Sequence, residues 1–298
     1  MDEKLWIENP HLKVGIIPSL GGRVTDIYLQ QGTQKNKNIL WWDTENSEKN
    51  FGWLHGGMPL LFPFAGWVWD GEQKGAYRVG KEQYLMPIHG FAHSQQWTII
   101  EAEESRLSLG LKDTKESLQQ FPWKFSVQQS WELSNHQLSY RIEVENDAVV
   151  GSHGQQRMPV SLGLHPYFSA EVFPQAQVVL ESEARSFCPV NSQGKADQEQ
   201  AVQRIHWDLS EKFHHNAILC DFSAGEKLSV LKTKDLALSL ESKPGAPTRC
   251  MVTWSDLQGK FFCLEPWMGK PDALNISCGI QWLELGERLN WSGSLSFS

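Results

Sequence analysis

The chain has 298 residues and a formal net charge of −8, from 27 lysines and arginines against 35 aspartates and glutamates. A chain of this length forms one large domain or two ordinary ones, and all-β domains often reach this size alone. An acidic chain lacks the basic face that binders of nucleic acid or of anionic membranes need, so we expect neither partner. Hydrophobic residues make up 40% of the chain, which is enough for a folded core.

Several features predict a cytoplasmic protein with reduced thiols. Met1 to Lys4 carries charge and no apolar stretch, so we expect no signal peptide. The longest apolar stretch, Met58 to Trp69, is too short to span a bilayer and contains two prolines. The five cysteines are widely spaced and form no CxxC pair, which argues against a disulfide or zinc framework.

Apolar and polar residues alternate along much of the chain, which is the period of a β-strand. Leu138 to Glu145 alternates residue by residue, and Ser134 to His136 supplies a turn after the extended stretch from Phe125 to Leu133. These stretches predict a hairpin. Shorter segments alternate in the same way: 107–111, 236–240 and 295–297.

No long segment has a helical period, and a short helix around Lys115 to Gln120 would be a connector. Many short strands separated by turns predict an all-β sandwich or barrel. The polar stretches 32–38 and 191–200 are predicted loops, and neither is long enough to link two domains. We therefore expect one domain over residues 1–298.

Three segments place an ionisable residue beside an apolar stretch, with glycine or proline next to it: Pro87 to His93, Ser161 to Phe168 and Phe261 to Trp267. Glu265 follows a predicted buried strand and precedes Pro266, which we expect to end the strand's ladder. Partial burial would raise the pKa of Glu265 toward the range of a general base or acid. The alternative is a strand-end glutamate that reaches solvent.

The histidines in these segments are open to two interpretations each. His165 lies in an apolar frame, where a histidine either exchanges protons near neutral pH or serves as a core residue with one hydrogen bond. His89 and His93 are four residues apart, but Gly90 between them argues against the helix that would make them metal ligands. We expect no metal site. No GxSxG, Walker or GxGxxG motif is present.

Six strings along nearly the whole chain together resemble the aldose 1-epimerase family, also called galactose mutarotase-like proteins. They are PSLGGR from Pro18, GGMPLLFP from Gly56, HGFA from His89, GLHPYF from Gly163, LEP from Leu264 and PDALN from Pro271. The resemblance implies a large antiparallel β-sandwich of the galactose mutarotase-like supersandwich type. It also implies a sugar cleft on one sheet.

The resemblance further implies roles for three residues: Glu265 as base, His165 as acid and His89 as a sugar contact. The base removes the proton of the C1 hydroxyl while the acid protonates the ring oxygen, and the C1–O5 bond opens. Because no hydride or acyl group moves, no cofactor is expected. We expect Glu265 to start ionised and His165 protonated, with coupled titrations.

The chain departs from the family pattern at three places in the expected sugar site. Trp67 stands near a position where many relatives carry arginine, His93 replaces another arginine, and Asn216 stands where several members place an aspartate. The loss of two arginines weakens the prediction of a hexose-6-phosphate substrate, although Arg23, Arg78 or Arg157 could replace them as phosphate donors. Trp67 suits either stacking on an uncharged sugar or packing under the cleft.

Three functions remain open at this point, each with a small-molecule sugar as partner and a monomer or homodimer as assembly. The first is a cofactor-free epimerase that interconverts the anomers of a free or phosphorylated aldohexose. The second is a non-catalytic sugar-binding or sensing protein on the same scaffold. The third is a glycosidase or lyase, which would need a second carboxylate; Asp272 is the nearest to Glu265 in sequence and is expected to be structural.

Overall fold

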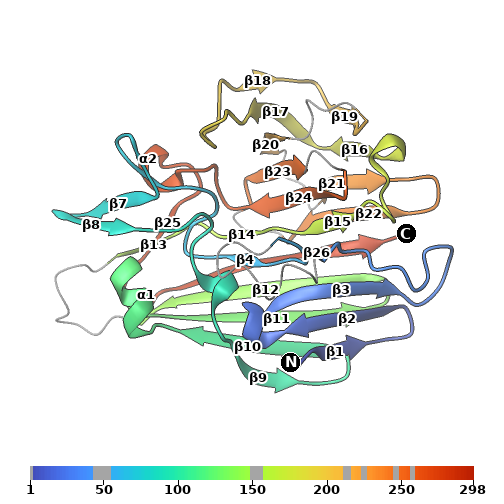
Figure 1. Cartoon of the computed structure of the whole chain (residues 1–298), viewed down its shortest axis with the longest axis horizontal. Coiled ribbons are helices and arrows are strands. Elements are labelled where there is room, and N and C mark those ends of the chain that lie inside the picture. Colours follow the sequence, from blue (N-terminus) through green and yellow to red (C-terminus); the bar gives the residue numbers. More distant parts are fainter. Residues whose placement is uncertain are drawn as a thin grey trace.

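A computed structural model describes residues 3–42, 55–147, 157–210, 216–222, 227–243, 248–255 and 259–298. The strands of its two large sheets pair antiparallel, and strands of the two sheets overlap in the upper half of the view in Figure 1. This architecture confirms the antiparallel β-sandwich expected from the alternation and from the family resemblance.

The first large sheet contains the predicted hairpin. Its strands are β9 (Thr98–Ala102), β10 (Arg106–Lys112), β11 (Phe125–Ser134), β12 (Gln137–Asn146), β16 (Val179–Ser182), β19 (Ile205–Asp208), β21 (Lys227–Lys232), β22 (Ala237–Ser242) and β26 (Arg288–Phe297). They follow the order β19-β16-β21-β22-β26-β12-β11-β10-β9. β11 pairs with β12 along its whole length, and Asn135 makes the turn with a φ of 51°, a conformation that asparagine tolerates.

The second large sheet carries the functional segments. Its strands are β4 (Leu60–Leu61), β14 (Gly163–Leu164), β15 (Tyr167–Ser169), β17 (Ala184–Pro189), β18 (Gln200–Ala201), β20 (Asn216–Phe222), β23 (Cys250–Ser255) and β24 (Phe261–Trp267). Their order is β18-β17-β20-β23-β24-β14-β4, and β15 also pairs with β24.

Small sheets and short helices surround the sandwich. The small sheets contain β1 (Leu5–Glu8), β2 (Leu12–Ile17) and β3 (Arg23–Leu29); β5 (Trp69–Asp70) and β6 (Gln73–Lys74); β7 (Ala76–Val79) and β8 (Glu82–Leu85); and β13 (Met158–Val160) and β25 (Gln281–Leu283). The helices are α1 (Lys115–Gln120), α2 (Ala273–Ile276) and the 3₁₀ turns η1 (Pro18–Leu20), η2 (Ala92–Ser94) and η3 (Gln175–Gln177). The predicted helix is therefore present as α1, capped by the Thr114 side chain. Among the described helices, none has the length and apolar character needed to cross a membrane.

Alternation gives the second sheet two different faces. Leu219, Met251 and Leu264 point into the main core, which joins side chains of both large sheets. Their sequence neighbours Ile218 and Val252 point to the opposite face, where a separate hydrophobic cluster lies. A core shared by both sheets agrees with one domain over residues 1–298, which stays a prediction. The outer face of the second sheet is where a cleft forms.

Candidate active site

The register of the second sheet brings His165 opposite Glu265. Glu265 lies near the end of β24, and His165 lies in the gap between the short strands β14 and β15. Both short strands pair with β24 in one continuous register. The gap therefore faces Glu265, and the two side chains meet across it, although they are distant in sequence.

The sequence led us to expect that Pro266 ends the hydrogen-bond ladder of β24, but the ladder continues past it. The strand continues to Trp267, and β23 pairs with it through Met251↔Pro266. The Trp267 carbonyl faces β23, where the Arg249 N–H donates to it at 3.0 Å. Because successive residues point to opposite sides, the Pro266 nitrogen faces the break between β14 and β15. A missing N–H costs little there.

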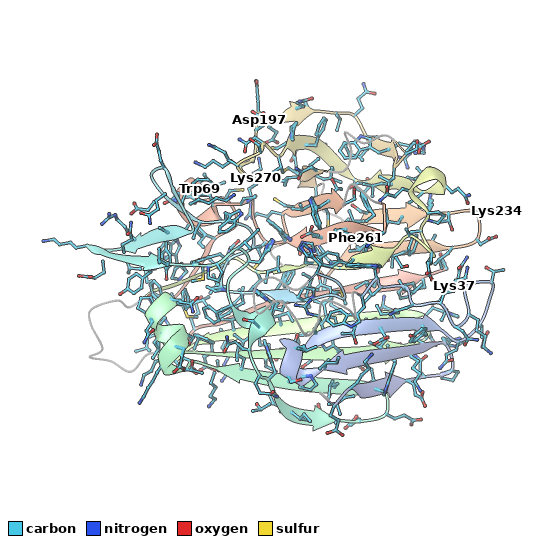
Figure 2. The ribbon with its side chains drawn as sticks, viewed as in Figure 1. Lys37, Trp69, Asp197, Lys234, Phe261 and Lys270 are labelled. Atoms are coloured by element: carbon cyan, nitrogen blue, oxygen red, sulfur yellow. The ribbon has the colours of Figure 1, made fainter. Side chains whose placement is uncertain are left out.

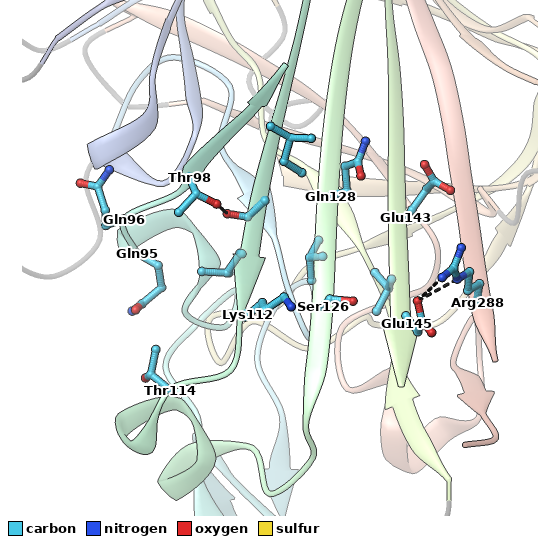
Figure 3. Close-up of a pocket in the computed structure, with 15 residues that line it drawn as sticks. Gln95, Gln96, Thr98, Lys112, Thr114, Ser126, Gln128, Glu143, Glu145 and Arg288 are labelled. Atoms are coloured by element: carbon cyan, nitrogen blue, oxygen red, sulfur yellow. Dashed lines mark hydrogen bonds and ion pairs between the residues drawn. The ribbon is translucent and has the colours of Figure 1, made fainter. Parts of the chain in front are cut away.

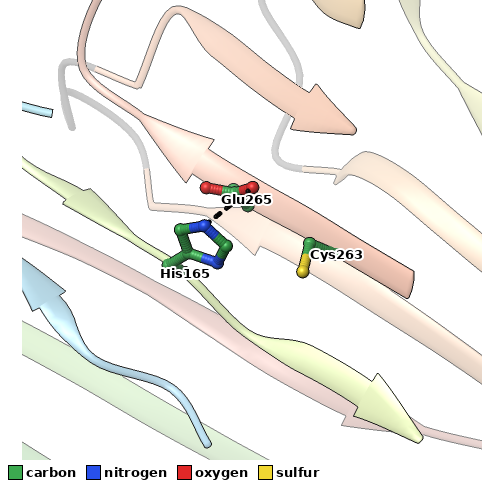
Figure 4. A group of neighbouring side chains, drawn as sticks. All are labelled: His165, Cys263 and Glu265. Carbon is green, nitrogen blue, oxygen red and sulfur yellow. Dashed lines mark ion pairs between the residues drawn. The ribbon is translucent and has the colours of Figure 1, made fainter. Parts of the chain in front are cut away.

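The catalytic candidates are buried and in contact. His165 Nε2 lies 3.4 Å from Glu265 Oε1 (Figure 4). The indole N–H of Trp267 donates to the other carboxylate oxygen, Oε2, at 3.1 Å. Glu265 is 1% exposed and His165 4% exposed, so the predicted alternative of a glutamate that reaches solvent is excluded.

Burial moves the two pKa values in opposite directions. Desolvation raises the pKa of Glu265 well above its usual value, and the Trp267 hydrogen bond opposes this shift. Desolvation lowers the pKa of His165 well below its usual value, and the nearby His89 and His55 lower it further. Both directions favour a neutral pair with the shared proton on Glu265, whereas the sequence led us to expect the ion pair.

His89 lies beside the pair, and its backbone adopts a positive φ. Its φ is 65°, and its Nδ1 accepts a hydrogen bond from the Gly66 N–H at 3.0 Å. An accepting Nδ1 assigns the ring proton to Nε2. The ring centroid lies 5.3 Å from that of His165 and 5.5 Å from that of Trp267. Burial lowers the pKa of His89, so it is a neutral N–H donor.

The pair lies at the floor of a cleft of about 360 Å³. Aromatic side chains dominate its walls: Trp67, Tyr167, Trp254 and Trp267, with the imidazole of His55. Residues of the predicted loop 191–200 form part of the rim. Flat aromatic faces beside convergent polar groups are typical of a site that binds a sugar ring.

The structure brings most of the predicted binding residues into this cleft. His89, Trp67 and Asn216 line it together with Glu265 and His165. The Trp67 ring also contacts the cation of Lys74, whose Nζ lies 4.6 Å from the ring centroid. Trp67 therefore forms part of the cleft wall and is not packed beneath it.

His93 lies elsewhere. It is buried in the turn η2, where its Nε2 lies 3.1 Å from the Gly90 carbonyl oxygen. It is not among the described residues that line the cleft. Its role as a sugar contact stays a prediction without support from this placement. The sequence also contains two adjacent histidines, His214 and His215, which lie outside the described residues.

Sequence reasoning missed several residues of the cleft. Tyr167 is part of the string GLHPYF and Trp267 directly follows the string LEP, so their positions were visible but no role was assigned to them. His55, Lys74 and Trp254 had no signal, because they come from distant parts of the chain. The His55 Nδ1 lies 3.2 Å from the Tyr167 hydroxyl, and the His55 ring stacks on Trp254.

None of the three arginines considered as phosphate ligands is among the described residues that line the cleft. Arg23 is buried and donates to the Gly56 carbonyl at 2.9 Å. Arg78 pairs with Asp70, and Arg157 pairs with Glu284. Among the described lining residues, Lys74 is the one lysine or arginine.

Asp272 has a structural role, as the sequence led us to expect. Its Oδ1 accepts hydrogen bonds from the Trp69 N–H at 3.1 Å and from the Asn275 amide at 2.7 Å. Trp69 is labelled in Figure 2. The Nζ of Lys195 lies 3.9 Å from the centroid of the Trp69 ring. Glu265 is consequently the one carboxylate among the described residues of the cleft wall.

A larger hollow of about 610 Å³ lies on the first large sheet (Figure 3). Glutamines, threonines and an ion pair between Glu145 and Arg288 line it. Its described lining contains no histidine and no buried carboxylate, so it lacks groups suited to proton transfer near neutral pH. The smaller cleft is the better candidate for an active site.

The fold and the cleft define an all-β protein with a buried acid–base pair in a sugar-sized site. The sequence profile of the aldose 1-epimerase family matches residues 3–296. The chain therefore belongs to the aldose 1-epimerase family. The recognition made from the six sequence strings is confirmed.

Relatives and solved structures agree with this membership. The plasmid-borne protein LacX of Lactococcus lactis subsp. lactis is 22% identical over 292 residues, which cover 90% of this chain and 88% of LacX. A galactose mutarotase related enzyme from Lactobacillus acidophilus superposes with a TM-score of 0.83 at 19% identity, covering 99% and 97% of the two chains. The Slr1438 protein from Synechocystis sp. PCC 6803 has a TM-score of 0.82 at 23% identity, covering 100% and 96%. At these identities the structural likeness shows the shared fold.

Proposed function

We propose that this protein is an aldose 1-epimerase that interconverts the α and β anomers of an aldohexose. The observation that carries the proposal is the 3.4 Å approach of His165 Nε2 to Glu265 Oε1 at the floor of an aromatic cleft. Ring opening needs one base and one acid within reach of two neighbouring oxygens, and this pair supplies both.

The reaction uses the single proton that the pair holds. Glu265 as carboxylate takes the proton of the C1 hydroxyl while His165 as imidazolium protonates the ring oxygen O5. The C1–O5 bond breaks, and rotation about C1–C2 presents the other face of the aldehyde. The roles then reverse as the ring closes. The Trp267 N–H supports Glu265 as the base, because it stabilises the carboxylate form.

The sugar-free neutral pair and the reactive ion pair contain the same number of protons. One proton transfer from Glu265 to His165 converts the first into the second. Sugar hydroxyls in the cleft supply polar contacts that favour the charged form. The reaction therefore needs no cofactor to store a proton.

The walls favour an uncharged aldohexose over a hexose 6-phosphate. Trp67 offers a flat face, while His89 and Asn216 offer polar contacts for sugar hydroxyls. A phosphate would find Lys74 as its one permanent cation among the described lining residues. Phosphate sites usually rely on bidentate arginine, which this wall lacks. The phosphorylated substrate is therefore the second candidate.

Two other functions are less well supported. Retaining and inverting glycosidases place two carboxylates around the scissile bond, and the described cleft wall contains one. A non-catalytic sugar sensor would not require a glutamate and a histidine buried in contact, because burial of ionisable groups is costly. We assign the protein to the cytoplasm, as a monomer or homodimer that acts on a free sugar.

Anomer exchange on freshly dissolved α-glucose and α-galactose, followed by NMR, tests the proposal, with glucose 6-phosphate as a parallel substrate. Glu265→Gln keeps the size of the side chain and removes the base, so exchange should fall by about 10²- to 10⁴-fold. Glu145→Gln, on the other large sheet, is the matched control. Sugar binding without any acceleration by the unmodified protein would support the sensor and overturn the epimerase. Cleavage of an oligosaccharide would support a glycosidase.

A further inference from the structure

A third buried side chain lies beside the acid–base pair, beneath the cleft lining. Cys263 lies two residues before Glu265 on β24, so both side chains leave the same face of the sheet. The His165 imidazole, the Cys263 thiol and the Glu265 carboxylate offer ligand atoms that all lie within 4.8 Å of one another (Figure 4). Each of these residues is buried.

We propose that the His165–Cys263–Glu265 cluster binds a divalent cation of the zinc class, and that the bound cation blocks the epimerase reaction. A nitrogen, a thiolate and a carboxylate together suit zinc or cobalt. A thiolate ligand disfavours magnesium and calcium, which prefer oxygen ligands alone. Three protein ligands leave a fourth position for water on the side of the cleft.

The spacing of the donor atoms fits a tetrahedral ion after small movements. Bonds of about 2.0–2.3 Å place tetrahedral ligand atoms about 3.3–3.8 Å apart. His165 Nε2 and Glu265 Oε1 are already 3.4 Å apart. The Cys263 sulfur lies at most 4.8 Å from the other two ligand atoms. It therefore has to move closer to them by at most about 1.5 Å, which a side-chain rotation can supply. His165 and Glu265 line the cleft, so an ion can enter from solvent.

The bound ion would occupy the lone pairs that the reaction needs. Nε2 of His165 and Oε1 of Glu265 would face the metal and could not exchange protons with the sugar. Sugar turnover and metal binding are therefore mutually exclusive. Glu265 and Cys263 must lose their protons to ligate, so metal affinity rises with pH. The inhibitory half of the inference rests on the proposed function, while the binding half does not.

Titration of the sugar-free, full-length protein with Co²⁺ tests the binding half directly. A thiolate-to-cobalt charge-transfer band and the strong visible bands of a four-coordinate ion are expected. Cys263→Ser, which nearly keeps the size of the side chain, should remove the charge-transfer band while the far-ultraviolet circular dichroism stays unchanged. Cys250→Ser is the matched control, because Cys250 is a buried thiol of β23 that lies in a separate cluster with Cys188 and Cys220.

Comparison with Cys250→Ser defines a result that would contradict the proposal. A charge-transfer band that survives in Cys263→Ser and disappears in Cys250→Ser would place the ion in the other thiol cluster and overturn the assignment. Absence of the band in the unmodified protein would overturn it as well.

Zinc inhibition of anomer exchange tests the second half. Zn²⁺ should inhibit the unmodified enzyme, a chelator should restore activity, and excess sugar should protect. Cys263→Ser should require at least about tenfold more Zn²⁺, the change that 1.4 kcal/mol of lost ligand binding represents. Equal inhibition of both proteins, or activation by Zn²⁺, would contradict the inference. Cobalt binding at Cys263 in a protein without any epimerase activity would support the metal site and count against the proposed function.

Discussion

Trp267 holds the carboxylate of Glu265 through a single hydrogen bond, and removal of that bond gives a defined change in the pH profile. Trp267→Phe keeps an aromatic ring in the cleft wall and removes the indole N–H that donates to Oε2 at 3.1 Å. Hydrogen bonds to charged groups contribute about 1.5–3 kcal/mol. Since 1.36 kcal/mol corresponds to one pH unit, the pKa of Glu265 should rise by about one to two pH units.

The direction of the change follows from the protonation of the pair. With the shared proton on Glu265, the reactive ion pair is the minor form between the two macroscopic pKa values. A higher pKa for Glu265 makes this form rarer by about 10- to 100-fold across the plateau of the profile. The alkaline limb, where Glu265 loses the proton, should move upward by about one to two pH units. The acid limb, where His165 gains a proton, should stay in place.

The assay is kcat/KM for anomer exchange measured by NMR across the pH range in which the protein is folded. Trp254→Phe is the matched control, because Trp254 also lines the cleft and no hydrogen bond links its indole to Glu265. Its profile should keep both limbs at the same pH as the unmodified enzyme. An unchanged plateau in Trp267→Phe, or an acid limb that moves while the alkaline limb stays, would refute the reasoning.

Three further outcomes are expected. Burial raises the pKa of Glu265, so its carboxyl destabilises the fold increasingly as pH rises from the ordinary value of 4.5 toward that raised pKa; urea unfolding at several pH values should show Glu265→Gln gaining stability over the unmodified protein across this range. Burial also lowers the pKa of His93 to about 4, so its neutral form contributes stability above pH 6.5 that is lost as pH falls toward 4; the loss of about 3 kcal/mol should be smaller in His93→Phe, and an equal loss in both proteins would contradict it. Lys74→Met should lower kcat/KM for glucose 6-phosphate about tenfold more than for glucose, and an equal effect would show that Lys74 does not contact the phosphate.

The sequence predicted the strands and the acid–base pair for physical reasons that act locally. Alternation over β11 and β12, with a turn at Asn135, is enough to identify a hairpin. Glu265 and His165 stood out because each follows apolar residues and precedes proline, a local signal of burial at a strand break. The structure adds that β24 continues through Pro266 to Trp267, and that the break between β14 and β15 lies opposite Glu265, so that both side chains line the cleft.

Other features depend on register between distant strands, which no local pattern encodes. Lys74, His55 and Trp254 reach the cleft from three separate parts of the chain, and Cys263 joins the pair because β24 presents it on the same face as Glu265. His93 was assigned to the sugar site from its place after the HGFA string. The turn η2 places its Nε2 3.1 Å from the Gly90 carbonyl oxygen, and its role as a sugar contact stays a prediction.

The central claim is that Glu265 and His165 together open the sugar ring. The most direct measurement is NMR anomer exchange of α-glucose and α-galactose with the unmodified protein, Glu265→Gln, His165→Asn and the double variant. If the pair acts as a unit, each single variant should lose about 10²- to 10⁴-fold and the double variant little more. Unchanged exchange in either single variant, or losses that multiply in the double variant, would contradict the account.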